Sequence, residues 1–245
     1  MKKYFFLFTL ALCTLCSCQS INHSLAEINV PHKTIFLSFD DGPNPHNNTT
    51  GRLLDILKKY DIQAMFSLMG TNTEYAPELV RRIHDEGHII INHGYSDRWN
   101  CSMNKKEFRD NLLKGDAAIS AALGYDTWPR LYRPHGGFYR LSQEKIWQEE
   151  GYTQIACNIR AYDAVMAEED RDRVIRTIIR KTEKQGAGII LLHDTRDSNE
   201  RMREGLKKRP LGSFNRSWIP DAVETIILEL REKGYNFEPS FPENR

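Results

Sequence analysis

Two kinds of apolar segment alternate along the chain. Short apolar runs typical of buried strands lie at residues 34–39, 64–68, 88–92, 131–133, 153–159, 188–192 and 235–237. Segments with the helical spacing of apolar residues, most of them longer, lie at residues 53–57, 76–86, 105–123, 142–150, 171–184 and 221–233. This alternation predicts a parallel sheet with crossover helices. We expect one closed or nearly closed β/α barrel, with an open doubly wound sheet as the alternative.

The first residues have the features of an export signal. Lys2 and Lys3 precede an apolar stretch at residues 4–15 that is too short to span a bilayer comfortably. Leu15-Cys16-Ser17-Cys18 resembles the lipobox of bacterial lipoproteins, which implies cleavage before Cys18 and lipid attachment to it; an ordinary secretory signal is the alternative. We expect an exported lipoprotein anchored to a membrane of the bacterial cell envelope. Its parts are a signal peptide at 1–17, a tether at 18–31 and a folded domain at 32–245.

Charge and cysteine content narrow the range of partners. The formal net charge of +1 argues against a nucleic-acid-binding protein, whose surface would be strongly basic. Cys101 and Cys157 could pair in an oxidising compartment, although nothing in the sequence brings them together. Residues 195–219 carry an excess of basic side chains, typical of a solvated loop or of a flap that contacts an anionic glycan. These side chains are Arg196, Arg201, Arg203, Lys207, Lys208, Arg209 and Arg216.

Polar side chains follow the predicted strands at the points where they end. The residues concerned are Asp40, Asp41, His93 with Asp97, Arg133, Asp163 and His193. In parallel α/β folds the carboxyl ends of the strands meet at one edge of the sheet, where reactive groups collect. The sequence therefore predicts one shared site.

Two adjacent carboxylates are the strongest candidates for chemistry. Asp40 and Asp41 end the first strand before Gly42-Pro43, and strand geometry sends their side chains in different directions. Like charges this close repel, so a metal on one carboxylate would leave the other free to move protons. An Asp-rich turn that caps the next helix is the alternative. His93 and Asp97, four positions apart, could both face one ion together with Asp41.

His193 and Arg133 each have a catalytic and a structural interpretation. His193 comes at the end of the most apolar strand. It could be a proton donor whose pKa is tuned by its neighbours, or a residue that caps the following loop. Arg133 could fix a carboxylate through two hydrogen bonds, or form a structural salt bridge.

Five ordered motifs carry a family resemblance. Ser38-Phe39-Asp40-Asp41-Gly42-Pro43, His93-Gly94-Tyr95-Ser96-Asp97, Arg133-Pro134-His135-Gly136-Gly137, the Asp163 region and Leu191-Leu192-His193-Asp194 resemble those of the polysaccharide deacetylases, the NodB-like carbohydrate esterases. The resemblance extends over residues 34–237. It implies a single distorted (β/α) barrel as the catalytic domain.

The resemblance also implies a mechanism. Asp41, His93 and Asp97 would hold one divalent metal ion, and Asp40, oriented by Arg133, would be the general base. His193, held by Asp163, would protonate the departing amine. The backbone N–H of Gly136 would help to stabilise the oxyanion, and Leu191 would line the pocket for the acetyl methyl group. The implied partner is an N-acetylated polysaccharide or peptidoglycan.

Three departures from the family pattern affect these expectations. We expect Zn²⁺ as the ion. Because Asp97 replaces a usual histidine and a carboxylate favours harder ions than imidazole does, Mn²⁺ or Co²⁺ are the alternatives. Arg160 and Ala164 alter the groove wall beside Asp163. His135 and Gly136 replace a proline–aromatic pair, which opens the lip of the site and lets His135 approach the metal. An O-acetyl esterase, or a non-catalytic glycan-binding lipoprotein with a degenerate metal site, are the competing functions.

Overall fold

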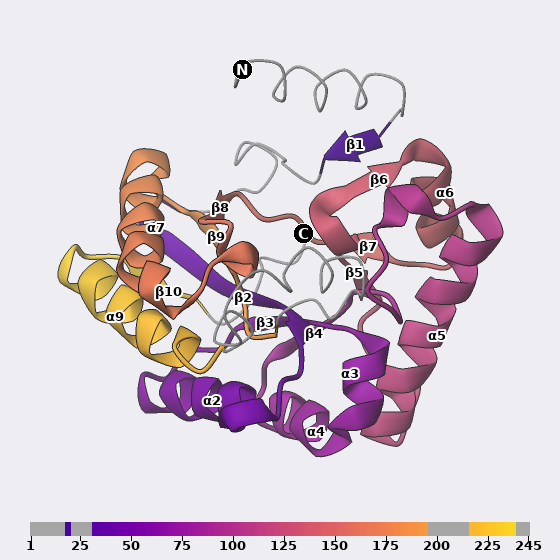
Figure 1. Cartoon of the computed structure of the whole chain (residues 1–245), viewed down its shortest axis with the longest axis horizontal. Helices are drawn as coiled ribbons and strands as arrows, with labels where there is room; N and C mark the ends of the chain where they lie inside the picture. Colours follow the sequence, from indigo (N-terminus) through magenta and orange to yellow (C-terminus); the bar gives the residue numbers. More distant parts are fainter. Residues whose placement is uncertain (1–17, 21–30, 196–215, 239–245) are drawn as a thin grey trace, which may run out of the picture.

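A curled parallel sheet with helices around it forms the body of the molecule (Figure 1). The computed structural model describes residues 18–20, 31–195 and 216–238. The sheet has eight strands in the order β7-β5-β4-β3-β2-β9-β8, with β10 paired to β2. Their bounds are β2 (Thr34–Gly42), β3 (Met65–Leu68), β4 (Ile89–Asn92), β5 (Leu131–Tyr132), β7 (Thr153–Gln154), β8 (Ile159–Arg160), β9 (Gly188–His193) and β10 (Asn236–Phe237).

Seven α-helices connect or flank these strands in the described part of the chain. They are α2 (Thr49–Lys59), α3 (Gly70–Tyr75), α4 (Pro77–Asp85), α5 (Lys105–Leu123), α6 (Leu141–Glu149), α7 (Arg171–Gln185) and α9 (Ile219–Glu232). Helix α5 shows how local sequence sets these bounds. The Asn104 side chain accepts from the backbone of Glu107, whose carboxylate accepts from Asn104 in return, and Gly124 ends the helix at φ 82°.

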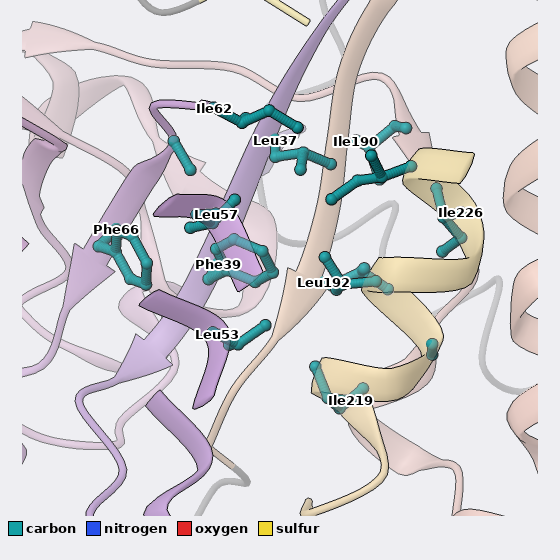
Figure 2. Packing of buried hydrophobic residues seen from close by; sticks show 14 of the residues in the cluster. Leu37, Phe39, Leu53, Leu57, Ile62, Phe66, Ile190, Leu192, Ile219 and Ile226 are labelled. Atoms are coloured by element: carbon teal, nitrogen blue, oxygen red, sulfur yellow. The ribbon is translucent and has the colours of Figure 1, made fainter. Parts of the chain in front are cut away.

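Alternation along the strands divides the core into two layers. On β2, Leu37 and Phe39 belong to the cluster that packs against the outer helices, where Ile226 of α9 is fully buried (Figure 2). Phe36 belongs to a second cluster within the curled sheet, together with Leu191 of β9. Burying one such side chain stabilises the fold by about 1.5–3 kcal/mol. Ser38, Asp40 and His193 continue the inner faces of these two strands towards their carboxyl ends.

The architecture confirms the expected distorted (β/α) barrel, with one error in its elements. Residues 153–159 were expected to form one strand, but they contain two, β7 and β8. Strand β7 pairs with β5 at one end of the sheet order, and β8 pairs with β9 at the other. The connecting residues thus pass from one end of the sheet order to the other, across the opening of the barrel. The short helix α3 was not expected, because six residues are too few to establish a helical period.

Several predictions about the ends of the chain lie outside the described residues. These are the signal peptide at 1–17, most of the tether, and the basic residues between 196 and 215. The start of the tether is instead a strand, β1 (Cys18–Ser20), which pairs antiparallel with β6 (Phe138–Arg140). Cys157 is a free buried thiol, so it does not form the pair with Cys101 that the sequence left open. Among the described residues, no helix is both long and apolar enough to cross a membrane.

Candidate active site

A bulge at the end of β2 brings both adjacent carboxylates to one place. Asp40 pairs with Ser67 of β3 and Gly42 with Leu68, so Asp41 is an extra residue in the ladder, with φ 73°. Left-handed backbone is uncommon but tolerated by aspartate. As a result the two side chains do not diverge as expected from a regular strand. Asp40 Oδ2 and Asp41 Oδ1 lie 3.7 and 3.3 Å from the same atom, His93 Nε2.

Asp41, His93 and His135 form a buried group that could hold a metal ion. One ligand atom from each lies within 4.8 Å of the other two. His135 Nε2 is 3.6 Å from Asp41 Oδ1. His93 Nδ1 is 2.8 Å from the backbone oxygen of Arg133, and a hydrogen bond there requires the proton on Nδ1. A neutral His93 would then offer the lone pair of Nε2 to an ion beside Asp41.

Asp97 lies beside this group but is not part of it. Its Oδ1 is 3.2 Å from His135 Nε2. His135 enters from η4 (His135–Gly137), directly after Pro134. Asp97, the third ligand predicted from the sequence, therefore faces His135, the third member of the buried group. Asp97 as a metal ligand stays a prediction, and the structure adds His135 as a second candidate.

The Asp41 carboxylate and the His135 imidazole have the charge states that suit a cation. Burial alone would raise the pKa of the Asp41 carboxyl, but the hydrogen bond from His93 and the nearby histidines bring it well below its usual range. Burial lowers the pKa of His135 to about 4, which leaves a neutral imidazole with an available lone pair. Burial also acts to lower the pKa of His93, but Asp40 and Asp41 outweigh it and raise that pKa. One carboxylate and two imidazoles form a donor set that fits Zn²⁺ and related divalent ions.

Arg133 holds Asp40 from the side away from this group. Its guanidinium donates to Asp40 Oδ1 and to Ser38 Oγ, each at 2.5 Å. The Nε atom donates to the carbonyl of Ile155 at 3.2 Å, and the side chain is fully buried. A buried guanidinium with all these partners fixes the position of the Asp40 carboxylate.

A second buried pair positions His193. His193 Nδ1 is 3.0 Å from Asp163 Oδ1, and its backbone N–H donates to Asp163 Oδ2 at 2.9 Å. Burial acts to lower the pKa of His193, but the charge and hydrogen bond of Asp163 exceed that effect and raise the pKa to about 9. Asp163 contacts Nδ1 and not Nε2 of the ring, and the side chain is 16% exposed.

Arg216 completes this arrangement and was not identified from the sequence. Its Nη2 donates to Asp163 Oδ2 at 2.6 Å and to the carbonyl of His193 at 2.7 Å, while Nη1 donates to the carbonyl of Asp163 at 2.9 Å. Its side chain is fully buried. The sequence placed Arg216 in a basic run that is typically solvated, and no local pattern distinguishes it from its neighbours. For this one residue the interpretation as part of a solvated loop or flap is wrong.

Asp194 is a second residue whose role the sequence did not reveal. It is fully buried, and Thr50 donates a short hydrogen bond to its Oδ2. A Cβ atom on Gly42 would lie 2.7 Å from both carboxylate oxygens, so glycine is required for this close approach. Burial raises the pKa of Asp194 to about 7. Asp194 therefore packs β9 against the turn that follows Asp41.

The predicted substrate contacts lie in the expected regions. Gly136, with φ 75°, follows His135 in η4. Leu191 lies on the inner face of β9, two residues before His193. The roles of the Gly136 N–H and the Leu191 side chain stay predictions. Gly136 differs from expectation in one respect, because Trp99 lies over it; an added Cβ would be 3.3 Å from the indole ring.

Comparison with known proteins defines the class. The fold matches that of a peptidoglycan N-acetylglucosamine deacetylase, Bc1960, with a TM-score of 0.68 and 27% identity over 89% of this chain and 92% of that one. The family model for polysaccharide deacetylases matches residues 27–155, just over half of the 245 residues. This chain belongs to the polysaccharide deacetylase family.

Curated relatives are similar over most of this chain. A peptidoglycan-N-acetylglucosamine deacetylase of Bacillus cereus is 30% identical over 83% of this chain and 65% of its own length. The peptidoglycan-N-acetylmuramic acid deacetylase PdaC of Bacillus subtilis is 34% identical over 83% of this chain. The chain spans only 37% of the length of PdaC.

Proposed function

We propose that this protein is a metal-dependent hydrolase that removes N-acetyl groups from amino sugars of a cell-envelope polysaccharide, with peptidoglycan as its substrate. One observation carries the proposal. Asp40 and His193 are direct partners in the register of β2 and β9, so a potential base and a potential acid stand side by side next to Asp41. Binding alone would require neither an arginine that holds Asp40 nor a carboxylate that holds His193.

The chain supplies a site for the metal that the family fold implies. Asp41, His93 and His135 would hold it, with Asp97 at hand beside His135. We propose Zn²⁺ as the ion, with Co²⁺ or Mn²⁺ as alternatives, because two imidazoles and one carboxylate match a common catalytic zinc donor set. When bound, such an ion polarises the acetyl carbonyl and acidifies a water molecule.

The remaining steps belong to the protein side chains. Asp40 accepts a proton from the attacking water, and its hydrogen bond from Arg133 keeps the carboxylate correctly oriented. His193 donates a proton from Nε2 to the departing amine, while Nδ1 stays hydrogen-bonded to Asp163. The N–H of Gly136 donates to the developing oxyanion. Acetate and a free amino sugar are the products.

Relatives support the substrate class. Those compared above are named for N-acetylglucosamine or N-acetylmuramic acid residues of peptidoglycan. Acetate release from the metal-loaded protein tests the proposal, with peptidoglycan, chitooligosaccharides, poly-N-acetylglucosamine and acetylated xylan as substrates. Release from the N-acetylated polymers supports it. Release from acetylated xylan alone would replace it with an O-acetyl esterase, and no release from any polymer would reject it.

The pH dependence of the reaction tests His193. A histidine acid is active while protonated, so kcat/KM should fall as the pH rises through its pKa, which Asp163 raises to about 9. Asp163→Asn removes the neighbouring charge, and the alkaline fall should move towards the ordinary histidine value of about 6.5. The pH profile of both proteins measures this, with thermal unfolding as a check on folding. An unmoved alkaline limb in a folded variant would remove the assignment.

We also propose that the protein is exported and anchored by lipid on Cys18. The Leu15–Cys18 tetrapeptide and the preceding basic and apolar residues support this. Cys18→Ala should move the protein from the membrane fraction to the soluble extracytoplasmic fraction, because single or absent acyl chains anchor weakly. Fractionation with immunoblotting measures the shift, and Cys157→Ala serves as the matched cysteine control. Equal membrane retention of both variants would contradict the proposal.

A further inference from the structure

Trp99 is unusual among the tryptophans of this protein. The chain has four of them, and Trp128, Trp147 and Trp218 are 8%, 1% and 1% exposed. Trp99 is 56% exposed. A single exposed apolar side chain is ordinary on a protein surface, so the position and the support of Trp99 must show whether its ring has a binding role.

The exposure of Trp99 does not come from a loose backbone. Its carbonyl accepts from the N–H and the hydroxyl of Ser102 at 2.9 and 2.7 Å. The next residue, Asn100, is fully buried; it donates to the hydroxyl of Tyr132 at 2.6 Å, and its carbonyl accepts from Gln143. The main chain on the carboxyl side of Trp99 is therefore held in place while its ring faces solvent.

The ring lies at the edge of the candidate active site. A Cβ added to Gly136 would meet three indole atoms at 3.3–3.5 Å, so the indole rests on the backbone of Gly136. Gly136 follows His135, a member of the metal-binding group, and Asp97 lies two residues before Trp99. The left-handed backbone of Gly136, with φ 75°, favours glycine at this position, and the indole packs closely against it. Trp99 therefore covers the lip that the sequence suggested was open.

We propose that Trp99 is a stacking platform for a pyranose ring of the substrate glycan, at the sugar next to the one that is deacetylated. An indole fixed by its backbone offers a rigid apolar face, and the axial C–H groups of a pyranose form a matching apolar face. Because the indole is exposed, a sugar stacked on it can keep its hydroxyl groups hydrated. This inference rests on the proposed function for the identity of its ligand.

Fluorescence provides a direct test, because Trp99 is the one exposed indole of the four. Acrylamide quenching of the metal-loaded Asp40→Asn chain should fall when tetra-N-acetylchitotetraose is added, since the sugar shields Trp99. In the Asp40→Asn/Trp99→Tyr chain quenching should be low and unaffected by the sugar. Calorimetry on the same proteins measures whether the sugar binds at all.

Kinetics on the protein with Asp40 intact provide a second readout. Trp99→Ala should raise KM for chitotetraose about two- to tenfold, the range expected for one aromatic contact, with a smaller change in kcat. Trp99→Phe should recover part of the loss. Tyr125→Ala is the matched control, because Tyr125 is an exposed aromatic residue in the loop that enters β5. This loop precedes the strand, whereas the candidate site lies at the carboxyl ends of the strands. Tyr125→Ala should leave KM unchanged.

The outcomes separate this inference from the proposed reaction. Sugar binding without protection of Trp99, or a Trp99→Ala chain with unchanged KM, would overturn the platform and leave deacetylation standing. Protection of Trp99 without acetate release from the enzyme with Asp40 intact would support the platform and overturn the reaction.

Discussion

Asp40→Asn is expected to reduce acetate release by about 10²- to 10⁴-fold, the usual contribution of a general base. Asparagine has nearly the same shape but cannot accept the proton of an attacking water. Arg133 would keep its hydrogen bonds to Ser38 and Ile155, so the surrounding structure retains most of its polar contacts. Because the metal-binding group consists of other residues, the metal content should not change.

Two controls make the Asp40 experiment decisive. Asp110→Asn alters an exposed aspartate that pairs with Lys106 on α5 and should leave turnover unchanged. Thermal unfolding of Asp40→Asn shows whether loss of the buried charge beside Arg133 has destabilised the fold, which can cost about 3–5 kcal/mol. A folded, metal-loaded Asp40→Asn enzyme that keeps its turnover would show that another group is the base.

The sequence allowed most of the barrel to be predicted because its helices and strands have distinct periods. Strands β2 and β9 are apolar on both faces, as expected for strands covered on one side by helices and packed on the other within the curled sheet. The error at residues 153–159 had a different origin. Whether β7 and β8 are one strand depends on the closure of the sheet, which no local pattern encodes.

The candidate site could be predicted where its residues lie at or just beyond the carboxyl ends of strands. Asp40 and His193 lie in the last residues of β2 and β9, His93 and Arg133 directly follow β4 and β5, and the topology of a parallel sheet brings such positions together. The side chains of Asp40 and Asp41 point towards the same place because of a bulge and the left-handed backbone of Asp41. The alternation of side chains along a regular strand does not predict this. Arg216 reaches Asp163 from a distant segment across the fold, so only the folded chain reveals its burial.

His135 and Asp97 show how the site differs from the family pattern. The pattern expects a histidine at 97 and none at 135, and this chain has the opposite arrangement. In space the two side chains meet, with His135 Nε2 3.2 Å from Asp97 and 3.6 Å from Asp41. An imidazole is thus available to the same group from a different loop. This arrangement argues against a site that has simply degenerated.

His135→Ala is therefore expected to weaken metal binding by more than about 100-fold, beyond the 10–100-fold typical of residues that only support a ligand. Asp97→Ala should have the smaller effect if His135 is the third ligand, because Asp97 then acts mainly through its contact with His135. Metal content after dialysis against a chelator measures both losses. Visible absorption of the Co²⁺-loaded proteins reports the donor set independently of activity.

His84→Ala is the matched control for His135, since His84 is a half-exposed histidine on α4 that pairs with Asp85. It should leave both metal content and the Co²⁺ spectrum unchanged. A larger loss in Asp97→Ala than in His135→Ala would instead support the ligand set that the family resemblance implies. The comparison works because the two buried side chains contact each other, so the ranking of the two losses depends on which side chain binds the ion rather than on general damage to the fold.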